Sequence, residues 1–196
     1  MTATDYGWKV SMRDAEVAET EVLLDGPKRF VRETLIMPAG EKLDWYYVDT
    51  PASVLVVPVL EAGQFVMVQQ YRYNLHRYTR EFPAGEAGDG ETMADAARRE
   101  LLEETGYEPA EGAALKPLGA FYSLPSETNK VTHVFLVQPV VYAGTAAKDS
   151  QIEKYFNMSV QITAPGLALA EIGKSVAGTE TITALLLARQ AMSALS

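Results

Sequence analysis

Three glutamates crowd one short segment of the chain, RELLEETG, in which Glu100, Glu103 and Glu104 lie within five consecutive positions. If the segment is helical, at about 100° per residue, the three carboxylates share one face. Like charges at this spacing repel each other, so the arrangement needs a compensating interaction. One interpretation is a solvated acidic face, partly neutralised by Arg98 and Arg99. The other is a divalent-cation site, because Mg²⁺ prefers oxygen ligands and commonly bridges carboxylates to substrate phosphates.

The residues around these glutamates carry helix signals. Thr92, followed three residues later by Asp95, resembles a capping box, and Gly106 suits the C-terminal stop. A helix over 92–105 is therefore expected. Beside the glutamates it presents a stripe of small and apolar residues that can pack on a sheet, namely Ala94, Ala97 and Leu101.

The rest of the chain alternates β-prone runs with turn residues, and two helical segments close it. Strands are expected at 22–24, 30–37, 43–48, 118–122 and 131–137, and helices at 166–174 and 179–193. Two further runs, VLVVPVL (54–60) and FVMVQQY (65–71), are joined by a short glycine-containing link and are expected to form a hairpin. The pattern predicts an α+β fold with a mixed sheet packed against helices. Pro51 lies at the one seam, between an N-terminal β region (1–50) and the main body (51–196).

The composition is that of an ordinary globular protein, with 196 residues, 47% hydrophobic and 22% charged. The formal net charge of −9 argues against nucleic acid as a partner, because duplex binding needs a basic face. A local arginine cluster or a bound cation can still admit a small anion. The absence of cysteine excludes disulfides, thiolate zinc sites and cysteine nucleophiles. Without a signal-peptide pattern or an apolar run of the ~18 residues that span a bilayer, we expect a cytoplasmic protein that binds no membrane.

A longer pattern surrounds the glutamates. The chain fits G-x5-E-x7-R-E-U-x-E-E-x-G-U, where U is bulky and apolar, at Gly85, Glu91, Arg99, Glu100, Leu101, Glu103, Glu104, Gly106 and Tyr107. With every specified position filled, this segment resembles the signature of the Nudix hydrolase family. The resemblance implies an α/β/α sandwich, in which a mixed sheet lies between helices and the signature forms a loop–helix–loop. It also implies hydrolysis of a nucleoside diphosphate linked to another moiety, with Mg²⁺ or Mn²⁺ as cofactor.

The same resemblance assigns roles within the signature. It implies metal ligands from the glutamate cluster and from the residue before the first glycine, namely Glu100, Glu104, Glu103 and the backbone carbonyl of Ala84. Glu103 and Arg99 are also catalytic candidates, and Arg99 is expected to orient the glutamates through a salt bridge with Glu91. Gly85 and Gly106 are expected to serve the backbone and not the chemistry.

The flanking sequence narrows the resemblance to one subgroup. The run QQYRYNLHRYTREFPAGE resembles Q-Y-R followed by E-x-P-A-G in ADP-ribose pyrophosphatases and related nucleotide-sugar hydrolases. In that subgroup an N-terminal β region helps to build a homodimer, and both subunits contribute to the substrate site. The ending GTETITALLLA also resembles the subgroup's C-terminal helix. The substrate it implies is ADP-ribose, cleaved to AMP and ribose 5-phosphate, with a GDP- or UDP-sugar as the alternative.

Several residues in these flanks are candidates for substrate binding. Arg72 and Arg80 have the forked guanidinium that suits phosphate oxygens, and Glu81 begins the E-x-P-A-G run. Trp45 is the candidate for stacking on a nucleobase, with Tyr46 or Tyr71 as alternatives. Packing within a sheet is an equally good interpretation of each aromatic residue.

The chain departs from the subgroup after the signature. The segment FYSLPSETNK keeps Pro125 but lacks the glycine of the usual S-P-G, and Glu127 follows almost at once. Glu127 is the candidate general base or additional metal ligand, against a plain exposed loop glutamate, and Glu153 is the second candidate.

Two rival functions share the signature. A non-catalytic nucleotide sensor is expected to lose signature glutamates or Arg99, and none is lost here. A hydrolase of oxidised nucleoside triphosphates is disfavoured by the N-terminal β region and the Q-Y-R flank. The run GLALAEIGKS (166–175) is not a P-loop, because its glycines are separated by six residues where four are required.

Overall fold

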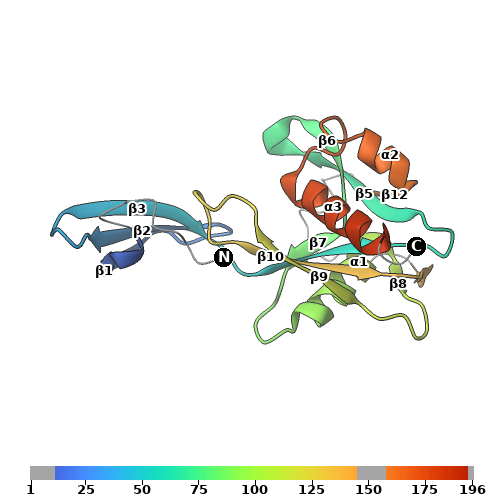
Figure 1. Cartoon of the computed structure of the whole chain (residues 1–196), viewed down its shortest axis with the longest axis horizontal. Helices are drawn as coiled ribbons and strands as arrows, with labels where there is room; N and C mark the ends of the chain where they lie inside the picture. The colour runs from blue at the N-terminus through green and yellow to red at the C-terminus, as the bar shows by residue number, and fades with distance from the viewer. Residues whose placement is uncertain (1–11, 145–157, 194–196) are drawn as a thin grey trace. The chain divides into compact units, whose positions relative to one another are not determined.

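The computed structural model describes residues 12–144 and 158–193 (Figure 1). The chain forms two compact units. The first comprises the chain up to Thr50 together with the loop Leu124–Lys130, and the second comprises Pro51–Ser123 and the chain from Val131 onward. The loop Leu124–Lys130, which carries Glu127, therefore belongs to the N-terminal unit although it lies far along the sequence.

The first unit is a three-stranded antiparallel sheet, formed in chain order by β1 (Glu16–Leu24), β2 (Arg29–Ile36) and β3 (Lys42–Asp49), after a short 3₁₀ helix η1 (Met12–Asp14). The loop Leu124–Lys130 is tied to β3 by side chains: the Thr128 hydroxyl donates to the Val48 carbonyl at 2.8 Å, and the Asn129 amide donates to Asp49 at 2.6 Å. All three predicted strands are present, but β1 begins well before the predicted 22–24, because polar residues of an exposed strand carry no hydrophobic signal.

The second unit contains two larger sheets and one small one. The four-stranded sheet has the order β7 (Ala84–Glu86), β4 (Ser53–Pro58), β10 (Val131–Val137) and β9 (Lys116–Tyr122). It is mixed, because β4 and β10 run parallel and the outer pairs are antiparallel. The antiparallel three-stranded sheet has the order β12 (Ser159–Thr163), β5 (Phe65–Arg72) and β6 (Arg77–Glu81), with η2 (Tyr73–Leu75) between β5 and β6. The small sheet pairs β11 (Val140–Tyr142) with β8 (Tyr107–Pro109).

The expected hairpin at 54–60 and 65–71 is wrong. Both strands exist, but β4 and β5 belong to different sheets, and the isolated bridge beside them joins Phe65 of β5 to Val59, which follows β4. The physical reason is that β4 is buried along its whole length, so it needs cover on both faces and takes a central position beside β10. A tight glycine-containing link therefore passes the chain from one sheet to the other.

The helix α1 (Met93–Thr105) confirms the prediction for the glutamate segment. The Thr92 hydroxyl accepts a hydrogen bond from the Asp95 N–H at 3.1 Å, and Gly106 ends the helix in the left-handed conformation, at φ 73°. The helix buries one face against the four-stranded sheet, in a cluster that includes Ala97, Leu101, Val54 and Val56. Ala96 belongs to that buried face, whereas the predicted Ala94 is only half-buried.

The other side of the sheet is covered by α2 (Pro165–Ala170) and α3 (Thr179–Ser193). Alternate residues of β4 face the two sides, so Leu55 and Val57 pack with the helical residues Ala168, Ala184, Leu185 and Ala188. Figure 1 shows α3, in red, lying across the strands of this sheet. The predicted α+β sandwich of helices around a mixed sheet is thus confirmed. The helix expected at 166–174 ends at Ala170, and the chain then turns through Gly173. None of the helices in the described ranges is long and apolar enough to cross a membrane.

Candidate active site on the carboxylate helix

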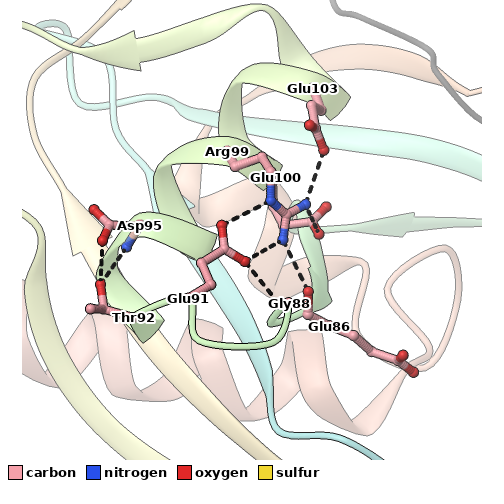
Figure 2. Close-up of polar contacts among 8 residues, drawn as sticks. All are labelled: Glu86, Gly88, Glu91, Thr92, Asp95, Arg99, Glu100 and Glu103. Atoms are coloured by element: carbon pink, nitrogen blue, oxygen red, sulfur yellow. Dashed lines mark hydrogen bonds and ion pairs between the residues drawn. The ribbon is translucent and has the colours of Figure 1, made fainter.

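Arg99 is the centre of a polar network on α1 and the loop before it (Figure 2). Its Nε and Nη2 atoms donate to the two carboxylate oxygens of Glu91, at 3.0 and 2.9 Å. Nη1 donates to Glu100 at 2.7 Å and to Glu103 at 3.1 Å, and Nη2 also reaches the backbone carbonyl of Glu86 at 3.0 Å. The predicted Arg99–Glu91 salt bridge is therefore present, and one guanidinium holds three carboxylates and the loop backbone in place.

The charges in this network stabilise one another. Hydrogen bonds from Arg99 and then from the Gly88 N–H lower the pKa of Glu91 to about 2. The pKa of Arg99 is raised, first by its hydrogen bond to Glu91 and then, against the opposing effect of desolvation, by Glu100 and Glu103. The guanidinium thus supplies part of the compensation that the crowded glutamates require.

Glu91 gives the protein a predictable sensitivity to acid. Because its pKa in the folded state, about 2, lies below the ordinary value of 4.5, it stabilises the fold fully above pH 4.5. That contribution is lost as the pH falls from 4.5 towards 2. We expect Glu91→Gln to be less stable than the wild-type protein at neutral pH, with the difference shrinking over this range. Urea unfolding of both proteins at several pH values measures it; a difference that stays constant with pH would contradict the assignment.

Glu104 lies in a different environment from its two neighbours. Its carboxylate accepts a hydrogen bond from the Ala84 N–H at 3.0 Å, where α1 meets β7. Withdrawal from water raises its pKa to about 8, with the Ala84 N–H opposing this shift and the Glu100 charge adding to it. A carboxylate withdrawn from water beside another carboxylate is a poor environment for a lone negative charge and a favourable one for a bound cation.

These residues fit a divalent cation in chemistry. Oxygen donors on one helical face suit Mg²⁺ or Mn²⁺. In the described part of the chain, however, no three acidic or histidine side chains are gathered closely enough to hold an ion. Arg99 engages Glu100 and Glu103, and the Ala84 N–H engages Glu104, so the three carboxylates would have to move closer together to bind one ion.

Gly85 allows β7 to approach α1 closely. A Cβ atom added to Gly85 would overlap the carboxylate of Glu100. The requirement here is for space, which explains why this position of the signature is a glycine.

Gly85→Ala is therefore expected to displace Glu100 and to reduce turnover by about tenfold or more. Gly88→Ala is the matched control, because a Cβ there meets Glu91 at an ordinary contact distance of 3.5 Å. Steady-state kinetics of both variants tests this, with thermal unfolding to confirm that each is folded. Equal activity of the two variants would show that the close approach at Gly85 is unimportant.

The structure brings the predicted signature residues together on α1 and β7: Glu100, Glu103, Glu104, Arg99 and Ala84. The contact made by Ala84 is through its N–H, and a role for its carbonyl as a ligand stays a prediction. Trp45 and Glu127 lie in the first unit, so their roles also stay predictions; Trp45 is 40% exposed, and the Glu127 carbonyl accepts from the Val48 N–H. Glu153 lies outside the described residues.

The two predicted phosphate-binding arginines project from opposite faces of the β5–β6 ladder. In the register, Gln70 is paired with Thr79 and Gln69 with Arg80, so Arg72 lies on the same face as Thr79, whereas Arg80 lies on the other. Arg72 forms an ion pair with Glu81, and the Nε atom of Arg80 is buried without a hydrogen-bond partner among the described residues. Arg72 and Glu81 therefore come together, and the strand register sets Arg80 apart from them.

Glu180 is a potential site residue that the sequence did not single out. It lies in the first turn of α3, where its carboxylate accepts from the Ser123 hydroxyl at 2.6 Å and from Thr132 at 3.4 Å. Its charge acts on both Arg72 and Glu81. The one available signal was an acidic residue in a helical first turn, which is too common to indicate a site.

Comparisons with known proteins show what this chain is similar to. A family model described as the NUDIX domain matches residues 49–172. The ADP-ribose pyrophosphatase of Bacillus subtilis (strain 168) is 32% identical over 128 residues, which cover 65% of this chain and 68% of that protein. The ADP-sugar pyrophosphatase of Mus musculus is 35% identical over 133 residues, covering 62% of this chain and 60% of that protein.

A solved structure, titled as an ADP compounds hydrolase, has a TM-score of 0.79 and covers 95% of this chain and 98% of its own, at 16% identity. At that identity the likeness concerns the fold alone. The fold is shared, the signature helix is intact, and the family model covers more than half of the chain. This protein therefore belongs to the Nudix hydrolase family.

Proposed function

We propose that this Nudix enzyme hydrolyses the pyrophosphate bond of a nucleoside diphosphate linked to a sugar, with ADP-ribose as the foremost substrate. The products are then AMP and ribose 5-phosphate. The observation that carries the proposal is the α1 network, in which Arg99 orients Glu91, Glu100 and Glu103 beside the Glu104 carboxylate. The relatives named ADP-ribose and ADP-sugar pyrophosphatase support this choice of substrate.

Each residue of the site has its own proposed role. Glu100 and Glu104, with Glu103, would hold Mg²⁺ or Mn²⁺. A bound cation of this kind neutralises charge on the diphosphate and lowers the pKa of a coordinated water. Arg99 keeps the carboxylates in position, Arg72 binds a phosphate oxygen, and Glu127 is the proposed general base.

A substrate panel tests the proposal. Purified protein with Mg²⁺ is offered ADP-ribose, ADP-glucose, GDP-mannose, UDP-glucose and NADH, and release of the nucleoside monophosphate is measured by chromatography. We expect ADP-ribose to give the highest kcat/KM, and excess EDTA to abolish turnover. Activity that survives EDTA would refute the metal requirement.

The same panel decides between the alternatives. The loop SLPSE lacks the glycine that ADP-ribose pyrophosphatases usually carry there, so a GDP- or UDP-sugar is the second candidate, and a higher kcat/KM for either would establish it. A nucleotide sensor would bind a member of the panel without releasing a monophosphate from any of them.

We further propose that the protein is a homodimer associated through its N-terminal unit. That unit exposes several large apolar side chains, including Leu24 (61%), Phe30 (38%) and Trp45 (40%). An exposed apolar sheet of this kind suits a self-complementary interface. Light scattering coupled to size exclusion measures the mass directly, and a mass of about 21.4 kDa for the species in solution would refute the dimer.

A further inference from the structure

Glu81 is the most highly hydrogen-bonded side chain on the β5–β6 ladder. The Nε atom of Arg72 donates to its Oε1 at 2.9 Å, and Nη2 of the same guanidinium donates to Oε2. The Thr79 hydroxyl donates to Oε1 at 2.6 Å, and the Gln70 amide donates to Oε2 at 3.2 Å. The strand register explains the convergence, since these four residues lie on one face of the ladder.

These contacts satisfy the carboxylate. An ionised carboxylate has about four lone-pair positions, and each oxygen of Glu81 already accepts two hydrogen bonds. Burial alone would raise the pKa of Glu81, but the hydrogen bonds and charge of Arg72, with Thr79, lower it. Glu81 is therefore an ionised group with no acceptor position left for a substrate hydroxyl.

Arg72 is in the opposite situation. Its side chain is 48% exposed, whereas that of Glu81 is 14% exposed, so the guanidinium stands between the carboxylate and solvent. A guanidinium has five N–H groups, of which Glu81 takes two along the Nε–Nη2 edge. The Nη1–Nη2 edge keeps the geometry for two parallel hydrogen bonds to phosphate oxygens.

We propose that Glu81 is a positioning residue that fixes the Arg72 guanidinium for the substrate diphosphate and does not itself contact the substrate. This inference rests on the proposed function, because it assigns Arg72 to the substrate of that reaction. It also replaces the expectation from the sequence that Glu81 binds substrate.

The Arg72–Glu81 ion pair has no net charge, so its contribution is to the orientation of the guanidinium. Removing the Glu81 charge therefore leaves the attraction of Arg72 for an anionic substrate intact or stronger, while the guanidinium loses its fixed plane. Misplacement of a group that acts in the transition state lowers kcat, whereas loss of a contact to bound substrate raises KM. The two roles for Glu81 thus predict different kinetics.

The experiment compares Glu81→Gln, Thr79→Val and the wild-type protein with ADP-ribose and Mg²⁺. We expect Glu81→Gln to lower kcat by about tenfold without raising KM. Thr79→Val leaves the Glu81 charge in place and gives the buried position a side chain of nearly the same shape, so we expect this variant to fold. Because it removes only one hydrogen bond to Glu81, its loss of kcat should be smaller. Glu108→Gln, at an exposed position on β8, is the control and is expected to match the wild type. In the Arg72→Lys background, Glu81→Gln should cause no further loss of kcat, because the two substitutions break the same ion pair.

A second measurement does not depend on turnover. The Nε–H signal of Arg72 in an NMR spectrum, assigned by its loss in Arg72→Lys, should be protected from solvent exchange in the wild type and unprotected in Glu81→Gln. A higher KM with unchanged kcat, an unchanged kcat and KM, or an unaltered Nε–H signal would each overturn the proposal. Absence of wild-type turnover on the whole substrate panel would instead refute the proposed function, with the NMR measurement still testing the positioning role.

Discussion

Glu104→Gln is expected to lower kcat/KM for ADP-ribose by about 10²-fold or more while leaving the protein as stable as the wild type, or more stable. The loss of activity follows if the Glu104 charge helps to hold a cation, because a neutral amide oxygen is a weaker ligand. The gain in stability follows from burial: withdrawal from water and the Glu100 charge raise the pKa of Glu104 to about 8, so folding at neutral pH requires this group to bind a proton, a cost that glutamine does not have. The glutamine oxygen can still accept from the Ala84 N–H. Kinetics in saturating Mg²⁺ and thermal unfolding without metal measure the two effects.

A loss of activity without a loss of stability distinguishes a functional role of Glu104 from a structural one. A side chain that only supported the fold would lose activity and stability together, whereas a functional charge held in an unfavourable place shows opposite changes. Glu111→Gln, at an exposed turn position, is the control and is expected to change neither quantity. Near wild-type turnover of Glu104→Gln in Mg²⁺ would remove Glu104 from the proposed metal ligands.

The helix α1 could be predicted from sequence because its signals are local. The Thr92 cap, the Gly106 stop and the spacing of the glutamates all lie within one segment of the chain, and the structure contains each of them. The Arg99–Glu91 pair was expected from the resemblance to the Nudix signature, and the structure contains it. The environment of Glu104 was not, because the three glutamates look equivalent in the sequence and differ only in what the sheet places beside them.

Pairing between distant strands was the main part that the sequence could not supply. The runs at 54–60 and 65–71 looked like a hairpin, yet β4 pairs with β10, which lies more than 70 residues further along the chain. The same missing register hid the fact that Arg72 and Arg80 face opposite ways, since a shift of one residue exchanges the faces of a strand. Short strands such as β7, β8 and β11 were missed because three residues carry no periodic signal.

Replacing Arg99 is expected to damage activity and stability together. Arg99→Lys keeps the positive charge but loses the planar fork that binds both oxygens of Glu91 and reaches Glu100, Glu103 and the Glu86 carbonyl. A lysine has one nitrogen and cannot make these contacts at once. We expect kcat/KM to fall by about 10- to 100-fold, as for other groups that orient metal-binding side chains. The melting temperature should fall by several degrees, because Glu91 and the loop before α1 lose their anchor.

The neighbouring Arg98 provides a control that differs by a single position. Its side chain is 51% exposed and its nearest acidic partner, Asp95, is 3.7 Å away, so it holds none of the three signature glutamates. Arg98→Lys is therefore expected to leave kinetics and melting temperature unchanged. If Arg99→Lys behaved like Arg98→Lys, charge alone would suffice beside the glutamates. The opposite result would establish that the directed hydrogen bonds of the guanidinium hold the carboxylates in position, and that the crowding of Glu100, Glu103 and Glu104 depends on them.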